Sequence, residues 1–350
     1  MHYQPKLESD LAAIRARIGK IAAEVQANLR AAGRAFLNHD RTLASETILN
    51  DLSVNRQTRD LDADCHAFVA RHSPAAVHLR FVSSVLRLSV ALERMGDYAA
   101  SICRETVQIS APCAAGVCTE MDALLRDSIG LLEEAIAAFL ESDEAAARSV
   151  IKRAASTESR FARAFSDLAR LGEERVPVRD SMAMLVVLNR ISRLRAQVKN
   201  VGEEVVFVKT GEVKAPKVYD VLFVDRANDL LGPLAQACAL QAFPESGQYE
   251  TAGTDPAGEL SSDLGELARE HGITLATAAP RNLAEISDLS RFHVIVVLQP
   301  IPAGTLDPPP FLTVRLDWEL DPKGGSAGLL QQISGRLSDL LFTLRGDRPQ

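Results

Sequence analysis

The sequence predicts a multidomain chain in which an all-helical bundle is followed by a small α/β domain with a parallel sheet. The chain has 350 residues, more than a single packed core usually holds. Residues 1–213 contain four of the 16 prolines, although they make up more than half of the chain. Before residue 213 apolar residues recur every three or four positions, and after residue 218 strand-like and helix-like runs alternate.

Apolar stripes with heptad-like spacing predict the helices of residues 1–213, because such spacing keeps one side of a helix against its neighbours. Breaks fall at Ser73-Pro74, at residues 111–116 and between Gly172 and Pro177. We therefore expect about six antiparallel helices. The stripes consist of Leu7, Leu11, Ile14, Ile18, Ile21 and Val25; of Phe81, Val85, Leu88, Leu92, Met95, Ala99 and Ile102; of Leu125, Ile129, Leu132, Ile136 and Phe139; and of Met184, Val187, Ile191, Leu194, Val198, Val201, Val205 and Val208.

The helical part contains an internal repeat. A shift of 99 residues superimposes apolar and charged residues of the first half on those of the second, which predicts two three-helix units. The acidic residues are not repeated, since Glu93 falls on Ser192 and Asp97 falls on Ala196. The superimposed pairs are Arg80 and Arg179, Leu92 and Ile191, Arg94 and Arg193, Met95 and Leu194, Ile102 and Val201, and Glu105 and Glu204.

Glu93 and Asp97 lie one helical turn apart, so both carboxylates can face a single cation. Their hard oxygen ligands suit Mg, Ca, Mn or iron. The alternative is a solvated helix face on which Arg94 is the intrahelical partner. The preceding helix adds three acidic residues, Asp60, Asp62 and Asp64.

Composition and charge limit the function and the location of the chain. The net charge of −7 disfavours a nucleic-acid binder, which needs a cationic face for the phosphate backbone. No apolar run reaches the roughly 18 to 20 residues of a membrane span. The five cysteines are scattered, which does not indicate a disulfide framework, and we expect reduced thiols in a cytoplasmic protein.

Residues 73–80 and 92–99 together resemble the PhoU phosphate-uptake regulators. Repeats of that family carry a proline before a leucine-arginine pair, and then a leucine-glutamate-arginine-isoleucine-glycine-aspartate segment. The resemblance implies a helical bundle with repeats at about residues 5–110 and 118–213. It also implies a divalent metal (iron, Mn, Mg or Zn) in the first repeat only, held by Glu93, Asp97 and, less directly, Asp62.

The same resemblance implies the partners of the protein. They would be the ATPase of a phosphate-specific transporter and a phosphate-sensing histidine kinase, with negative regulation of phosphate signalling. It also implies a homodimer. We expect no nucleic-acid partner and no membrane-spanning segment.

Residues 218–350 alternate strand-like and helix-like runs, which predicts a small doubly wound domain with a parallel sheet. Apolar, β-branched runs predict its strands, and helices are expected between them and at the end. The expected strands are 218–224, 292–298 and 311–316, and the expected helices are 233–240, 262–271 and 328–344.

Residues 218–345 resemble the low-molecular-weight protein tyrosine phosphatases and their arsenate-reductase relatives, through residues 221–224, 251–258, 270–275 and 317–322. The resemblance places a degenerate phosphate loop at Asp225, Asn228, Leu231 and Gly232, and a vestigial general acid at Asp321.

Phosphatases of that kind need a cysteine thiolate as the nucleophile and an arginine that clamps the phosphate oxygens. Asp225 and Leu231 stand at these two positions. A carboxylate repels a phosphate dianion and leucine cannot donate to it, so we expect no catalysis.

The sequence therefore favours a non-enzymatic regulator or adaptor of phosphate signalling and transport, with domains at 1–213 and 218–350. Two enzymes remain as alternatives, a phosphatase with Asp225 as its nucleophile and a metal-assisted hydrolase that uses Glu93 and Asp97. A third alternative is a sensor that binds an oxyanion at the loop of residues 225–232.

Overall fold

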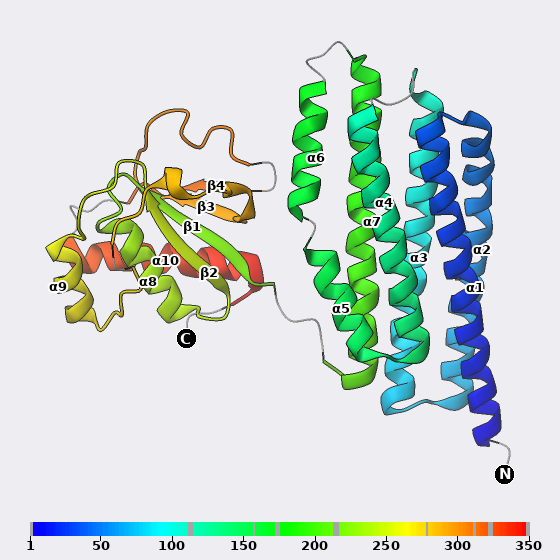
Figure 1. Cartoon of the computed structure of the whole chain (residues 1–350). Helices are drawn as coiled ribbons and strands as arrows, with labels where there is room; N and C mark the ends of the chain where they lie inside the picture. The colour runs from blue at the N-terminus through cyan, green and yellow to red at the C-terminus, as the bar shows by residue number, and fades with distance from the viewer. Residues whose placement is uncertain are drawn as a thin grey trace. The chain divides into compact units, whose positions relative to one another are not determined.

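The computed structural model shows two compact units, Met1–Lys214 and Ala215–Gln350 (Figure 1). Each unit has its own hydrophobic core. The described residues are 3–110, 115–156, 158–171, 176–212, 217–277, 279–310, 313–320 and 325–347.

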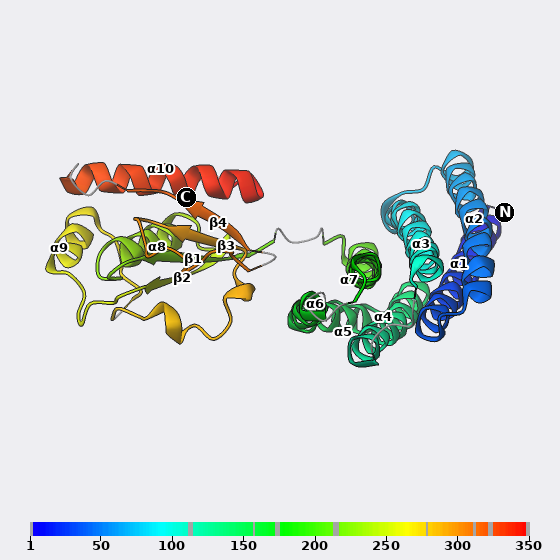
Figure 2. The ribbon, with the colours of Figure 1, turned by 90° about the horizontal axis from the view of Figure 1, so that it is seen from above.

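The N-terminal unit is a bundle of helices that run up and down. In Figure 2, α2, α3 and α7 form one layer, and α1, α4, α5 and α6 form the other. The central pair, α3 and α7, pack against each other. The helices are α1 (Tyr3–Asn38), α2 (Arg41–His72), α3 (Ala76–Gln108), α4 (Ala115–Glu141), α5 (Glu144–Ala155), α6 (Glu158–Leu171) and α7 (Val178–Thr210).

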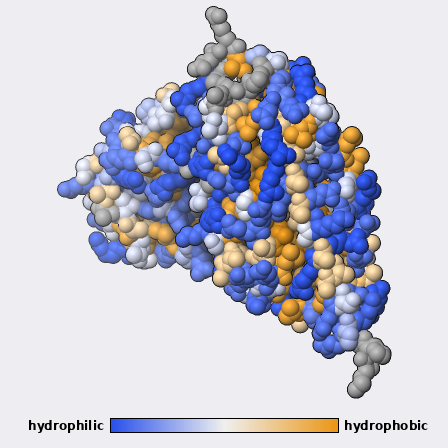
Figure 3. All heavy atoms as spheres, turned by 45° about the vertical axis from the view of Figure 1, so that its right-hand side comes forward, coloured by the Kyte–Doolittle hydropathy of each residue, from blue (hydrophilic) through white to orange (hydrophobic). Residues whose placement is uncertain are grey.

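The predicted apolar stripes form the core of this bundle. Ile18 and Val25 on α1 and Leu92 and Met95 on α3 are 0% exposed, as heptad-like packing requires. Figure 3 shows mostly hydrophilic side chains on the outward faces of the helices, with apolar surface in narrower bands. The prediction of a helical bundle is therefore confirmed.

One predicted helix is broken into α5 and α6, whereas its counterpart α2 is continuous. In the alignment of the two repeats, Gly96 of α3 corresponds to Arg195 of α7. A Cβ at Gly96 would lie 2.6 Å from Asp51 Oδ1, so α2 passes close to α3 there. Arg195 donates from Nε to the Ala154 carbonyl (3.2 Å) and from Nη2 to the Arg153 carbonyl (2.9 Å). The buried guanidinium thus caps the end of α5 where the helix breaks.

Two arginines tie the repeats to each other. Arg80, near the start of α3, donates from Nε to the Val208 carbonyl near the end of α7 (3.2 Å). Arg179, its counterpart at the start of α7, donates to the side chain of Gln108 at the end of α3. Each central helix therefore begins against the end of the other, as a twofold repeat requires.

The C-terminal unit has a parallel sheet with strand order β2-β1-β3-β4, as expected for a doubly wound domain. The cores on the two faces of the sheet are separate. One contains residues of α8, α9 and α10, and the other contains residues of two short 3-10 turns, η1 and η2. The elements are β1 (Tyr219–Asp225), α8 (Leu231–Ala242), β2 (Gly247–Gly253), α9 (Ser262–His271), η1 (Leu283–Glu285), η2 (Leu289–Arg291), β3 (Val294–Val297), β4 (Val314–Asp317) and α10 (Gly325–Arg345).

Strand β2 is the strand that the sequence prediction missed, and the short turns η1 and η2 were not predicted either. Its residues, Gly247–Gly253, include two glycines, a glutamine and a glutamate, and they lack the continuous apolar run of β1. Pairing with β1 along seven residues holds the segment in the sheet. The expected third strand is found as β4, with residues 311–312 outside the described part of the chain.

No helix in the described part of the chain is long and apolar enough to cross a membrane. Cys65, Cys103 and Cys238 are buried and reduced, as expected. The expectation of reduced thiols is wrong at Cys118, which is disulfide-bonded.

Replacement of a core residue tests the packing of the bundle. Leu92→Ala removes a side chain that is 0% exposed and leaves a cavity between α3 and its neighbours. We expect a loss of about 2–5 kcal/mol in the free energy of unfolding, measured by urea unfolding with far-UV circular dichroism. Leu52→Ala on α2, where the leucine is 54% exposed, should change it by less than about 0.5 kcal/mol. Equal losses would contradict the packing described.

Candidate functional site

The predicted acidic pair lies on the outer side of α3. Glu93 and Asp97 are exposed and one helical turn apart, while Gly96 between them is buried. The close approach of α2 at Gly96 brings Asp51 to this point, since its Oδ1 lies 2.6 Å from the place that a Cβ on that glycine would occupy. The site therefore lies where α2 passes close to α3 at Gly96.

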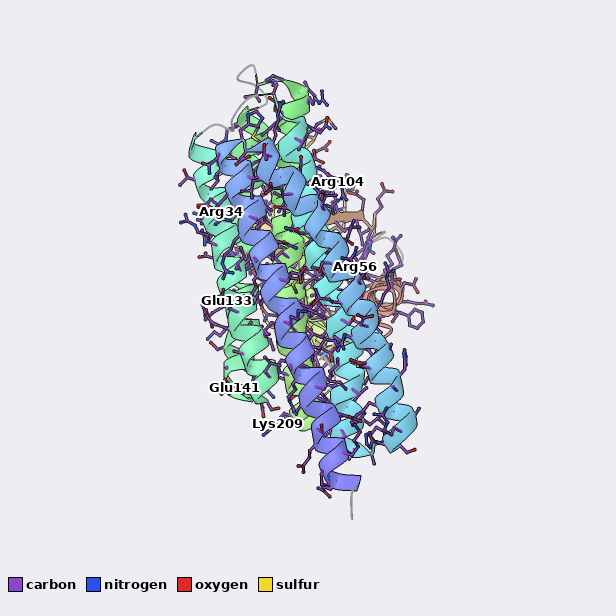
Figure 4. All side chains as sticks on the ribbon, turned by 90° about the vertical axis from the view of Figure 1, so that its right-hand side faces the viewer. Arg34, Arg56, Arg104, Glu133, Glu141 and Lys209 are labelled. Atoms are coloured by element: carbon purple, nitrogen blue, oxygen red, sulfur yellow. The ribbon has the colours of Figure 1, made fainter. Side chains whose placement is uncertain are left out.

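Asp51 is the α2 carboxylate that faces the pair. The residue is 5% exposed, and its Oδ1 is buried without a hydrogen-bond partner. Burial raises the pKa of Asp51, and the nearby charge of Asp97 and, more weakly, of Glu93 raises it further. Arg104, two turns beyond Asp97 along α3 (Figure 4), acts in the opposite direction. The charges of three carboxylates therefore act on one another, and the positive charge of Arg104 offsets them only in part.

Asp62 lies elsewhere along α2. The Ser89 hydroxyl donates to the Thr58 carbonyl (3.4 Å), so Thr58 is level with Ser89. Because α2 and α3 are antiparallel, Asp62 lies a further turn away from Glu93. The structure does not bring Asp62 to the acidic pair. Its neighbours Asp60 and Asp64 bind Arg17 of α1, at 3.6 and 2.9 Å.

The sequence does indicate Asp51 as a candidate site residue. The indication is its place in the pattern of buried residues of α2, and not the spacing of the acidic pair on α3. Asp51 occupies a position on the buried stripe of α2, between Thr47 and Val54. A carboxylate at a core position requires a partner. Within the described ranges, no three His, Cys, Asp or Glu side chains are already arranged to hold a metal ion.

The loop after β1 holds the second candidate site. Asp225, the last residue of β1, is 1% exposed. Its Oδ1 accepts from the backbone N–H of Asn228 (2.5 Å), and its Oδ2 accepts from that of Gly232 (2.8 Å). Burial raises the pKa of Asp225 to about 6, although these two hydrogen bonds favour the charged form.

The other residues of the loop support this arrangement. Asn228 has a left-handed backbone (φ 52°), and its Oδ1 accepts from the Thr251 hydroxyl (2.5 Å). A Cβ at Gly232 would lie 2.2 Å from the Thr251 Oγ1, so only glycine fits there. Leu231 is 5% exposed and packs in the core with α8, and it offers no donor to the loop. Asp321 lies outside the described residues.

The part of the chain that contains the first site matches the model of a known family. Residues 18–106 match the PhoU domain. This range includes α2, most of α3 and the carboxylates of Asp51, Glu93 and Asp97.

Relatives extend the likeness over the whole N-terminal unit. The phosphate-specific transport system accessory protein PhoU homolog of Pseudomonas aeruginosa is 24% identical over 216 residues, which cover 60% of this chain and 88% of the relative. The PhoU accessory protein of Escherichia coli is 28% identical over 142 residues, 41% of this chain and 59% of that protein.

The solved structure of a PhoU protein shows the same bundle fold. The crystal structure of PhoU from Pseudomonas aeruginosa has 23% sequence identity and a TM-score of 0.56, and it covers 59% of this chain and 99% of that one.

A thioredoxin-dependent arsenate reductase of Corynebacterium glutamicum is similar at 24% identity and a TM-score of 0.32, over 44% of this chain and 76% of that chain.

The PhoU domain match covers the first repeat, which contains the acidic pair. The match stops at residue 106, near the end of the first repeat. In the second repeat Ser192 and Ala196 replace the acidic pair, and the buried Arg195 lies between them. The second repeat therefore keeps the packing of the bundle without this acidic pair.

The raised pKa of Asp225 predicts a specific pH dependence of stability. The folded pKa of about 6 lies above the unfolded value of 3.8, so folding takes up a proton between these values. The free energy of unfolding of the C-terminal unit should therefore fall as the pH rises from about 4 to 6, by about 3 kcal/mol. Fluorescence of Trp318, the single tryptophan, reports on this unit because the residue is buried in its core.

Asp225→Asn is the matched control, since it keeps the shape of the side chain and does not titrate. We expect the difference between the wild-type and variant profiles to show the step between pH 4 and 6. Parallel profiles for the two proteins would contradict the burial of a titrating carboxylate at this position.

Proposed function

We propose that the protein is a non-enzymatic regulator of phosphate transport and phosphate signalling, which acts negatively through protein contacts of its N-terminal unit. The observation that carries this proposal is the likeness to the Pseudomonas aeruginosa accessory protein over 88% of that relative's length. The relatives are named for phosphate-specific transport, and the match of the PhoU domain covers the first repeat.

The loop after β1 supports the non-enzymatic part of the proposal. Asp225 and Leu231 stand where the phosphatase resemblance expects a cysteine and an arginine. The carboxylate of Asp225 already accepts the amides of Asn228 and Gly232, which a phosphate would otherwise need. Leu231 is buried in the core and cannot offset the charge of a phosphate.

We propose the ATPase of a phosphate-specific transporter and a phosphate-sensing histidine kinase as partners, and a homodimer as the assembly. Exposed apolar side chains on the bundle support contacts of this kind, because such surface favours association. Leu49 on α2 is 66% exposed, Leu52 is 54% exposed, and Met182 on α7 is 62% exposed.

We further propose that a divalent metal binds where α2 passes close to α3, through Glu93, Asp97 and Asp51, with Asp51 in place of Asp62. The buried, unpartnered Oδ1 of Asp51 fits this role, as does the hard oxygen chemistry of all three groups. The metal would supply a charge that offsets the three carboxylates. Glu93 and Asp97 are exposed, so their side chains are free to turn toward it.

Metal analysis of protein purified without chelator tests this site. We expect iron, Mn or Zn in the wild-type chain, and its loss both in Glu93→Gln/Asp97→Asn and in Asp51→Asn, because each variant removes an anionic ligand. Asp62→Asn is the matched control and should retain the metal. Retention in Asp51→Asn together with loss in Asp62→Asn would contradict the assignment.

Deletion and complementation in the source organism test the regulatory function. Loss of the chain should activate a phosphate-starvation reporter at high phosphate, and the wild-type chain should restore repression. Asp225→Asn should restore it equally, since the proposal assigns no chemical step to Asp225. Repression that depends on the Asp225 carboxylate would argue for phosphoryl chemistry in the C-terminal unit.

A further inference from the structure

A groove lies between α3 and α7, the central helices of one layer of the bundle (Figure 2). Its volume is about 720 Å³, within the range of ~300–1,000 Å³ that is typical of ligand pockets. Val90 is 43% exposed, so apolar surface of the groove is open to solvent. The walls are mostly apolar and include Leu86, Val90 and Ala91 on α3 and Val201 and Phe207 on α7.

The other half of the contact between α3 and α7 is closed by the chain itself. There Arg190 of α7 reaches across to α3. Its guanidinium lies 6.0 Å from the centre of the Tyr98 ring, and its Nε donates to the Ser101 hydroxyl (3.0 Å). A long side chain thus fills the space between the two helices at this end.

Smaller side chains stand at the equivalent positions of the groove. The shift of 99 residues between the repeats places Ala91 of α3 at the position of Arg190. The same shift places Gln197 of α7 at the position of Tyr98. Both residues line the groove, and alanine has no side chain that could cross to the other helix. The groove is therefore the place where the repeat lacks its own filling group.

The acidic groups of the groove walls already have basic partners. Arg87 of α3 binds Glu204 of α7 through two contacts of 2.6 Å, which join the helices at one end of the groove. Glu203 lies 4.0 Å from the Nζ of Lys199 on the same helix. These carboxylates are thus compensated within the bundle.

Arg94 is the cation of the groove that has no such partner. The residue is exposed, and it takes part in no ion pair within the described ranges. Its acidic neighbours on α3, Glu93 and Asp97, do not line the groove. An occupant that brings a carboxylate to Arg94 would therefore complement the charge of this wall.

The shape and the chemistry of the groove favour a helix as its occupant. The lining of α7 extends from Gln197 to Phe207, which is about 15 Å, or roughly three turns of a helix. An extended peptide would place backbone N–H and C=O groups against apolar side chains that cannot bind them. A helix pairs these groups internally and can present apolar side chains at spacings of three and four residues.

We propose that the α3–α7 groove is the docking site for an amphipathic helix of a partner protein. The apolar side chains of that helix fill the space beside Ala91, and a carboxylate next to them binds Arg94. This inference rests on the proposed function, because a regulator that acts through protein contacts needs such a surface, and it names the chemistry of the partner.

Binding of a synthetic helix to the full chain tests the proposal. The probe is a fluorescein-labelled, helix-stapled peptide of about 12 residues, with leucines at i, i+3, i+4 and i+7 and one glutamate beside them. We expect saturable binding to the wild type by fluorescence anisotropy. Arg94→Glu should weaken it roughly tenfold, and a probe with lysine in place of the glutamate should restore the affinity in this variant.

Substitutions within the groove should block the probe. Ala91→Arg/Gln197→Tyr rebuilds the contact that closes the other half, so we expect the affinity to fall roughly tenfold. Val90→Glu should have the same effect at an exposed position, and it keeps the test decisive if the double variant does not fold. Val77→Glu is the matched control, since Val77 is 50% exposed on the same helix and does not line the groove.

Three results would overturn the proposal. The first is a wild type that does not bind the probe, or that binds it no better than Val90→Glu does. The second is equal affinity of the wild type for the glutamate and the lysine probes. The third is a dimer of the wild type that becomes a monomer in Val90→Glu by light scattering, which would assign the groove to a second copy of the chain.

The phosphate-starvation reporter separates this inference from the proposed function. Val90→Glu should fail to restore repression, whereas the wild type and Val77→Glu restore it. Full repression by Val90→Glu would overturn the docking site and leave the proposed function standing. A wild-type chain that does not repress would contradict the proposed function, whatever the probe binds.

Discussion

The carboxylate of Asp225 is the constraint around which the loop after β1 is built. It is buried at the end of β1, and two loop amides rather than a cation compensate its charge. The loop can keep this geometry only with glycine at 232 and a left-handed residue at 228. An anion fixed at that point repels a phosphate group, so the same contact that orders the loop argues against phosphoryl transfer.

The two repeats of the N-terminal unit share one fold but carry different charges at equivalent positions. Both repeats share the apolar core and the arginine contacts that join α3 to α7. At Gly96 two helices approach closely and bring Asp51 to Glu93 and Asp97. At Arg195, the equivalent position, a buried cation donates to two carbonyls at the end of α5. The two repeats thus differ in charge and in helix contacts at one equivalent position.

Much of the fold could be predicted from the sequence, because periodic burial leaves a periodic pattern. The stripes of α1, α3, α4 and α7 and the apolar runs of β1 and β3 are of this kind. Strand β2 could not be found, since its place depends on pairing with β1 and not on its own composition. The choice between Asp51 and Asp62 depends on the register of α2 against α3, which spacing along one helix does not contain.

Turnover of phosphomonoesters by the purified full chain tests the central claim most directly. The account predicts no release of phosphate from p-nitrophenyl phosphate beyond the rate in buffer, and no phosphorylated form of the chain by intact mass spectrometry. Release that Asp225→Asn abolishes, or a phosphoryl adduct on Asp225, would contradict the account.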